Sequence, residues 1–419
     1  MRRLIRTCAL LTAAFLSAVI NMPGQGAGDS RPAVRLIDNP AAPLSGQPNL
    51  YTDARGRTFL SWIEPAGDNR HALRFAVRSG GKWSEPRTIA EGSDWQVSWA
   101  NFPSIIALPD GTLAAHWLVK NGAGGHTCDV KVARSSDGGK TWGKPIVPHR
   151  DNTPTEHGFV SMLPLAGGKA GAVWLDGRKS MPQEAGASHG GHHGPSASEM
   201  TLRYAAIGAD GQLSEEAELD GRVCDCCQTS AAATSEGAVV VYRDRSDAEV
   251  RDISVVRLRG GRWSAPVTLH ADGWRIEGCP VNGPSVDAGG DLVAVAWFTM
   301  IKDVPRVNVA FSTDAGASFG RPIQVDEGAP FGHVGVVVLG DGSAAVSWLE
   351  KTAKGGEVKA RRIHPDGARG GAVTIAPSSA ARATGFPRMA RAGDEIVVAW
   401  TDSASPARVR TAVMKLAVR

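Results

Sequence analysis

Short apolar stretches that end on an aromatic residue recur along the whole chain. Their aromatic residues are separated by 55, 57, 68, 55, 51 and 52 residues. The stretches are rich in Val, Ala, Leu and Ile and are flanked by Gly or Asp-Gly turn signals, a pattern that predicts β-strands. They occupy residues 58–62, 113–117, 170–174, 238–242, 293–297, 344–348 and 396–400.

A repeat of roughly fifty residues with four strands is typical of a β-propeller. We therefore expect an all-β fold, a single β-propeller of four-stranded blades. Seven repeats can be counted, and a count of six stays open if one repeat is not a complete blade. The last repeat shows only three strands, so residues 34–37 are expected to supply its fourth strand and close the ring.

Two eight-residue segments, 135–142 and 312–319, match the pattern S-x-D-x-G-x-(T/S)-(W/F). The aspartate can accept backbone hydrogen bonds within its own turn, and the glycine tolerates a positive φ. This pattern resembles the Asp-box, or bacterial neuraminidase repeat, of the sialidase superfamily. The resemblance implies a propeller in which the boxes are structural turns on the face away from the site. The expected turn residues are Ser135, Asp137, Gly139, Trp142, Ser312, Asp314, Gly316 and Phe319.

The resemblance also implies a site at the channel mouth. Sialidases hold the substrate carboxylate with arginines and use a tyrosine nucleophile and a carboxylic acid. The candidates on loops predicted to share that rim, together with one tyrosine, are Asp176, Arg178, Arg245, Arg388 and Tyr242. Two family features are absent, because the chain has no Arg-Ile-Pro motif near its start and no tyrosine after Tyr242.

Two functions follow as hypotheses. The first is an exported sialidase-like propeller that recognises a glycan at the channel mouth, with hydrolysis of exo-α-sialidase type left open. The alternative is a non-catalytic periplasmic binding propeller, in one form a copper or zinc protein.

The amino terminus predicts export. A basic start, an apolar run over residues 8–20 and small residues near 24–28 are typical of a secretory signal peptide. We therefore expect residues 1–28 to be the signal peptide and residues 29–419 the propeller, in the periplasm or secreted, with no further transmembrane segment. The formal charge of +4 falls to +1 without Arg2, Arg3 and Arg6, which gives no electrostatic case for nucleic acid.

Five cysteines remain after the signal peptide, and all are predicted to lie on the mouth side of the ring. One interpretation is disulfides, above all a bridge from Cys279 to a cysteine of the 224–227 run. The other is a copper or zinc site, to which the histidines of a long loop after the third aromatic repeat contribute. The candidate ligands are Cys128, Cys224, Cys226, Cys227, Cys279, His189, His192 and His193.

Overall fold

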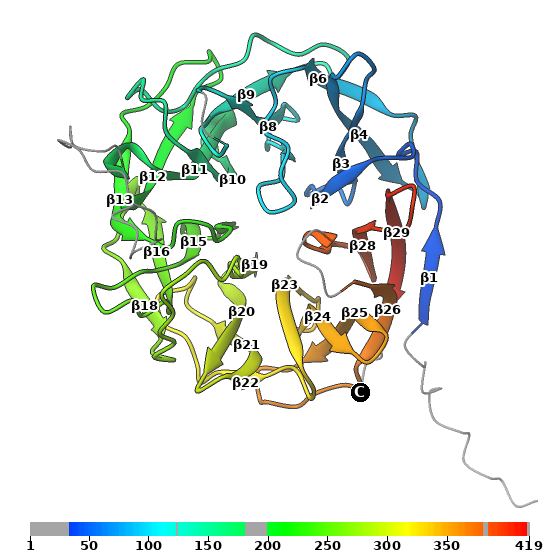
Figure 1. The fold of residues 1–419 in the computed structure, drawn as a ribbon, viewed down its shortest axis with the longest axis vertical. Helices are drawn as coiled ribbons and strands as arrows, with labels where there is room; N and C mark the ends of the chain where they lie inside the picture. Colours follow the sequence, from blue (N-terminus) through cyan, green and yellow to red (C-terminus); the bar gives the residue numbers. More distant parts are fainter. Residues whose placement is uncertain (1–32, 123–124, 181–198, 380–383, 417–419) are drawn as a thin grey trace, which may run out of the picture.

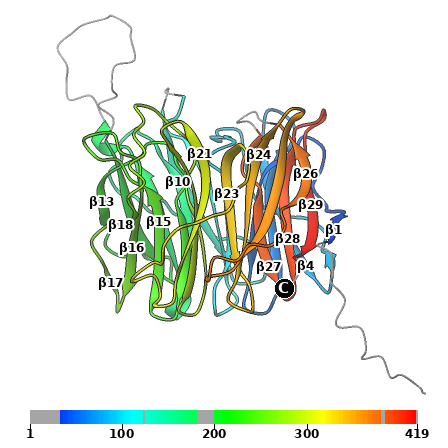
Figure 2. The ribbon, with the colours of Figure 1, turned by 90° about the horizontal axis from the view of Figure 1, so that it is seen from below.

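The computed structural model describes residues 33–122, 125–180, 199–379 and 384–416. They form seven β-sheet blades arranged in a ring around a central channel (Figure 1). Seen edge-on, the strands run across the thickness of the disc (Figure 2). The predicted all-β propeller is confirmed, and the count is seven rather than six. No helix within the described residues is long and apolar enough to cross a membrane.

The blades follow one another along the chain, each beginning at the channel. The first three contain β2 (Gly46–Thr52), β3 (Thr58–Pro65), β4 (His71–Ser79), β5 (Lys82–Trp83) and β6 (Arg87–Gly92); β7 (Ser104–Ala107), β8 (Leu113–Lys120) and β9 (Cys128–Ser135); and β10 (His157–Leu165), β11 (Lys169–Asp176), β12 (Met200–Ile207) and β13 (Ala217–Val223). In the second blade, a bridge between Val132 and Ile146 takes the place of a fourth strand. Two short 3-10 turns, η1 (Ala166–Gly168) and η2 (Arg178–Ser180), lie in the third blade.

The remaining four blades complete the ring. They contain β14 (Ser230–Thr234), β15 (Gly237–Arg243), β16 (Ile253–Arg259), β17 (Arg262–Trp263) and β18 (Val267–His270); β19 (Ser285–Gly289), β20 (Leu292–Ile301), β21 (Val304–Ser312) and β22 (Ile323–Gln324); β23 (Pro330–Val338), β24 (Ala344–Thr352), β25 (Gly355–Ile363) and β26 (Val373–Ser378); and β27 (Arg388–Ala392), β28 (Glu395–Asp402), β29 (Arg408–Lys415) and β1 (Ala33–Ile37).

Strand β1 closes the ring as expected. It pairs antiparallel with β29, from Ala33 opposite Lys415 to Ile37 opposite Thr411. The seventh blade is thus built from both ends of the described chain, and β29 gains a partner for its outer edge.

The aromatic residues of the repeat are buried in the second strand of every blade. All seven are at most 5 % exposed: Trp62, Trp117, Trp174, Tyr242, Trp297, Trp348 and Trp400. Three of them donate their indole N–H to a carboxylate two residues later, Trp62 to Glu64, Trp174 to Asp176 and Trp348 to Glu350. Because these strands end near the mouth, this W-x-carboxylate contact satisfies a buried indole at the rim of three blades.

The two predicted Asp-box turns have the expected local geometry. Asp137 accepts hydrogen bonds from Ser135 Oγ and from the backbone N–H groups of Lys140 and Thr141. Asp314 is held in the same way by Ser312 and Ser318. Gly139 has φ +83° and lies against Phe75 of the preceding blade, where an added Cβ would meet the ring at 2.3 Å. The box turns therefore fasten one blade to the next.

Candidate functional site

A cavity of about 830 Å³ occupies the centre of the ring. Residues from the innermost strands of all seven blades line it. We call the face where these strands begin the mouth face, and the opposite face, which carries the Asp-box turns, the box face. The cavity extends from the box-face turns near Ala54 and Gly340 to Phe102 and Arg388 on the mouth side.

An aromatic cluster covers the mouth end of the channel. His333 stacks on Phe386 with ring centroids 4.1 Å apart, and Trp99 stacks on both. Phe102 and Phe331 pack at the sides of this stack. The imidazole of His333 also bonds the carbonyl of Gly385 at 2.7 Å. The mouth predicted as a polar rim therefore carries an aromatic cluster, which sequence analysis missed because its members come from two separate loops and from strand β23.

Arg388 contacts this cluster through Phe102. Its guanidinium carbon is 4.7 Å from the centre of the Phe102 ring, a cation–π contact. Burial lowers the pKa of Arg388 to about 10. No carboxylate of the described residues forms an ion pair with it. A second arginine of the cavity wall, Arg391, donates to the carbonyls of Gly393 and Val338. Arg388 thus offers the cavity a positive charge that has no ion-pair partner among the described residues.

Side-chain amides connect the innermost strands just below the mouth. Asn101 accepts from the N–H of Phe159, Gln228 from that of Gly283, and Asn282 from that of His333. In each case the acceptor belongs to one blade and the donor to the next. We call Asn101, Gln228 and Asn282 the amide belt. Its members hold the strand starts in place and are already engaged by backbone groups.

Asp176 is part of a buried ion cluster rather than of the cavity wall. Its carboxylate is fully buried and accepts from Trp174 Nε1 at 2.8 Å and from Arg178 Nε and Nη2 at 2.7 Å each. Burial raises its pKa, but the bonds from Arg178 and the charge of His157 outweigh this and hold the pKa below its usual range. Arg178 also pairs with Glu216 at 2.8 Å. A carboxylate held in this way is an ionised acceptor.

Arg245 and Tyr242 lie in the fourth blade with partners of their own. Arg245 pairs with Asp225 at 3.1 Å and with Glu249 at 2.9 Å. The Tyr242 hydroxyl donates to Asp220 at 2.6 Å, and burial together with the Asp220 charge raises the pKa of the phenol. Of the five residues predicted from the sialidase resemblance, Arg388 alone lines the cavity. The structure does not bring the three arginines together on one ligand position.

Histidines and aspartates between the second and third blades form a cluster that sequence analysis did not identify as a unit. The rings of His149 and His157 stack with centroids 3.7 Å apart. His157 faces an acceptor at each nitrogen, the Cys128 carbonyl at 3.0 Å and Asp151 Oδ2 at 3.1 Å. Burial, followed by the neighbouring His157, lowers the pKa of His149 to about 4.

The possible ligand atoms of this histidine cluster are close enough to hold a metal ion, but several of them already accept hydrogen bonds from the protein. Asp151, His157 and Asp176 have ligand atoms within 4.8 Å of one another, as do Asp129, His149 and His157. The Asp176 oxygens are occupied by Trp174 and Arg178, and the N–H of Val130 donates to His149. The cluster is satisfied by its own residues and fixes the loop between β9 and β10.

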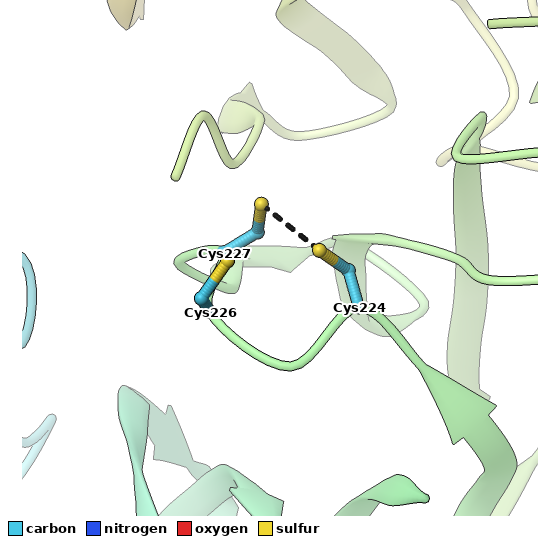
Figure 3. A group of neighbouring side chains, drawn as sticks. All are labelled: Cys224, Cys226 and Cys227. Atoms are coloured by element: carbon cyan, nitrogen blue, oxygen red, sulfur yellow. Dashed lines mark hydrogen bonds between the residues drawn. The ribbon is translucent and has the colours of Figure 1, made fainter. Parts of the chain in front are cut away.

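The cysteines of the 224–227 run separate into two kinds. Cys226 forms a disulfide with Cys279, which joins the loops leading into the fourth and fifth blades. A bridge between this run and Cys279 was expected from the sequence and is confirmed. Cys224 and Cys227 are buried free thiols, and their sulfurs are 3.2 Å apart (Figure 3).

Charged and polar groups surround this buried thiol pair. Arg251 Nη1 lies 3.2 Å from the Cys224 sulfur, and the backbone N–H of Asn282 donates to the Cys227 sulfur at 3.4 Å. Burial would raise the pKa of Cys224, but the hydrogen bond from Cys227 and the charge of Arg251 lower it to about 7. The pKa of Cys227 is raised, chiefly by burial, so Cys224 is the more acidic thiol of the pair.

The other predicted ligands do not join this pair. The Cys128 thiol donates to the carbonyl of His157 at 3.3 Å, and burial with Glu156 nearby raises its pKa to about 12. His189, His192 and His193 lie outside the described residues. The predicted set of eight ligands therefore reduces, within the described chain, to the run 224–227 and its partner Cys279.

No protein-family model and no curated protein sequence matches the chain. Among solved structures it is similar to a protein of unknown function from Dyadobacter fermentans, with 14% identity, a TM-score of 0.50, and coverage of 93% of this chain and 99% of that one. It also aligns with the polysaccharide lyase Uly1 (10% identity, TM-score 0.49, 88% and 90% coverage). A third match is the NanB sialidase from Streptococcus pneumoniae (9% identity, TM-score 0.44, 93% and 95% coverage). At such identities the likeness concerns the fold and not the ligand.

Proposed function

We propose that this protein is a binding propeller whose channel takes an anionic ligand against Arg388. The observation that carries the proposal is the Arg388 guanidinium in the wall of an 830 Å³ cavity, without a carboxylate partner among the described residues. A charge that is desolvated and unpaired attracts an anion more strongly than an exposed one, because little water competes for it. A guanidinium can also bind a carboxylate through two parallel hydrogen bonds.

The ligand class that we propose is a sugar that carries a carboxylate. The cavity wall carries the hydroxyls of Ser161 and Thr229, which bond to each other at 2.8 Å and keep acceptor lone pairs for the hydroxyls of a sugar. The Phe102 ring beside Arg388 offers an apolar surface for the face of a sugar ring. The resemblance of the two Asp-box segments to the sialidase superfamily points to the same ligand class.

Recognition fits the geometry better than hydrolysis. Hydrolysis of the sialidase type needs a nucleophile and an acid beside the bound sugar. Tyr242 and Asp176 are buried outside the cavity wall, each bound to its own partners. We therefore propose a glycan-binding role and not a glycosidase.

Binding of glucuronic acid and N-acetylneuraminic acid, compared with neutral glucose, tests this proposal. Saturation-transfer NMR and calorimetry should detect the acidic sugars and not glucose. Arg388→Met should weaken binding about tenfold or more, since a charge-assisted pair is worth roughly 1.5–3 kcal/mol. Arg410→Met removes an exposed arginine of the same blade and should bind as wild type. Equal binding of glucose, or full binding by Arg388→Met, would contradict the proposal.

A hydrolysis assay distinguishes a protein that only binds the glycan from one that also hydrolyses it. We expect no release of sugar from a sialoside by the wild-type protein. Turnover that disappears in Tyr242→Phe would restore the hydrolase hypothesis.

The copper or zinc hypothesis has weaker support from the geometry. With Cys226 and Cys279 joined to each other, Cys224 and Cys227 are the thiols that remain in this cluster. A structural zinc site uses four ligands, so two sulfurs are not sufficient.

A further inference from the structure

Four cysteines at the mouth face form two pairs with different access to solvent. Cys279 is exposed and Cys226 is partly buried, so their disulfide can be reached from outside. Cys224 and Cys227 are at most 1 % exposed and lie behind it. The sulfurs of Cys224, Cys226 and Cys227 all lie within 4.8 Å of one another. The inner thiols are therefore within a short movement of the outer disulfide.

We propose that Cys224 and Cys227 are a redox-active dithiol that exchanges with the Cys226–Cys279 disulfide, so that the four cysteines form a two-pair thiol–disulfide relay. The run Cys224-Asp225-Cys226-Cys227 is a C-x-x-C spacing, the arrangement in which two cysteines can form a short-loop disulfide. This site is separate from the channel, and it does not depend on the sugar-binding proposal.

The exchange balances without an added oxidant. The Cys224 thiolate attacks the Cys226 sulfur, a new S–S bond forms, and the electron pair of the broken bond leaves on Cys279. The Cys227 sulfur then attacks Cys224, which forms the Cys224–Cys227 disulfide and releases Cys226 as a thiolate. The proton that Cys227 carried passes through solvent to the outer pair. One disulfide is consumed and one is formed, and the exposed pair becomes a dithiol.

The surroundings of the two pairs favour both the attacking thiolate and the leaving thiolate. Arg251 is 2 % exposed and is held by Glu249 at 2.7 Å, so its guanidinium stays beside the Cys224 sulfur. The leaving sulfur belongs to Cys279, which is exposed, so water can solvate the departing thiolate. The N–H of Asn282 is placed to donate to Cys227.

Equilibration of the folded protein in glutathione buffers, from reducing to oxidising, tests the relay. After acid quenching, alkylation and tandem mass spectrometry assign every cysteine as thiol or disulfide. We expect two successive two-electron steps, ending with Cys224–Cys227 and Cys226–Cys279 both formed. In molecules that hold one disulfide, the bond should be found on the inner pair in some and on the outer pair in others. Cys128 should remain a thiol throughout and is the internal control.

The variant Cys224→Ser should show a single step and keep its one disulfide on Cys226 and Cys279. Since a buried substitution can impair folding, the time course of native-state alkylation of wild-type Cys279 is a second measurement. Slow alkylation of Cys279 without added reductant supports exchange between the inner thiols and the outer disulfide. Inner thiols that stay reduced in the most oxidising buffer overturn the proposal. Stoichiometric copper or zinc, with thiols recovered only after a chelator, overturns it in favour of a metal site.

Discussion

At the scale of single residues, the carboxyl group of Glu156 makes the stability of the fold depend on pH, and no local sequence pattern indicates this. Glu156 precedes β10 on the mouth face, and burial followed by the charge of Asp225 raises its pKa from 4.5 to about 7. Asp225 belongs to the cysteine run of the next blade. The two acids are far apart in the sequence, so their interaction depends on the packing of the third blade against the fourth.

The raised pKa of Glu156 leads to the first prediction. The folded protein binds this proton more tightly than the unfolded chain, so the contribution of Glu156 to stability is greatest below pH 4.5 and is lost as pH rises to about 7. Glu156→Gln should be more stable than wild type at about pH 8, by roughly 1–2 kcal/mol after allowance for partial exposure. The two should unfold alike at about pH 4. Glu215→Gln, at an exposed position, serves as the control, and an identical pH profile for Glu156→Gln and wild type in urea unfolding would refute the assignment.

At the scale of the element, the W-x-carboxylate contact gives a second prediction. Glu350 is 6 % exposed and accepts from Trp348 Nε1 and from the N–H of Ala329, both at 2.6 Å. Glu350→Ala leaves two buried donors without partners, at about 1–3 kcal/mol each. We expect unfolding at clearly lower urea concentration than wild type. Glu357→Ala, on the neighbouring strand and partly exposed, should change stability by no more than about 0.5 kcal/mol.

The amide belt gives a third prediction at the same scale. A Cβ on Gly283 would lie 2.0 Å from the carbonyl oxygen of Gln228, which is backbone and cannot rotate away. Gly283→Ala should therefore cost about 1–3 kcal/mol or more, since overpacking forces the backbone to shift. Gly278→Ala adds the same methyl where no atom lies within 4 Å and should be nearly neutral. Equal melting temperatures for the two variants would show that the belt can adapt.

At the scale of the whole molecule, the sequence predicts the architecture better than the site. The strand pattern and the aromatic spacing are local signals that repeat seven times, and the Asp-box pattern occurs twice, so the propeller and its ring closure could be predicted. The site depends on groups from different blades. Asp176 was a plausible acid by position, but its bonds to Trp174 and Arg178 appear only when its side-chain partners are known. The sequence predicted that Cys279 pairs with a cysteine of the 224–227 run. It did not show that the partner is Cys226, or that Cys224 and Cys227 remain as a pair of free thiols.

Ring closure makes the whole molecule depend on a strand of five residues. Without Ala33–Ile37, the backbone groups of β29 would face solvent as an open sheet edge, and Val34 would be lost from its contact with the seventh-blade core. A chain that starts at Asp38 should therefore melt at lower temperature and aggregate through that edge, whereas one that starts at Pro32 keeps β1 and should match a chain that starts at Asp29. Thermal unfolding with light scattering distinguishes them. If both truncated chains melt alike and remain monomeric, the ring does not need this closure, and the remaining six blades with a three-stranded seventh would be sufficient to hold the channel and its Arg388 in place.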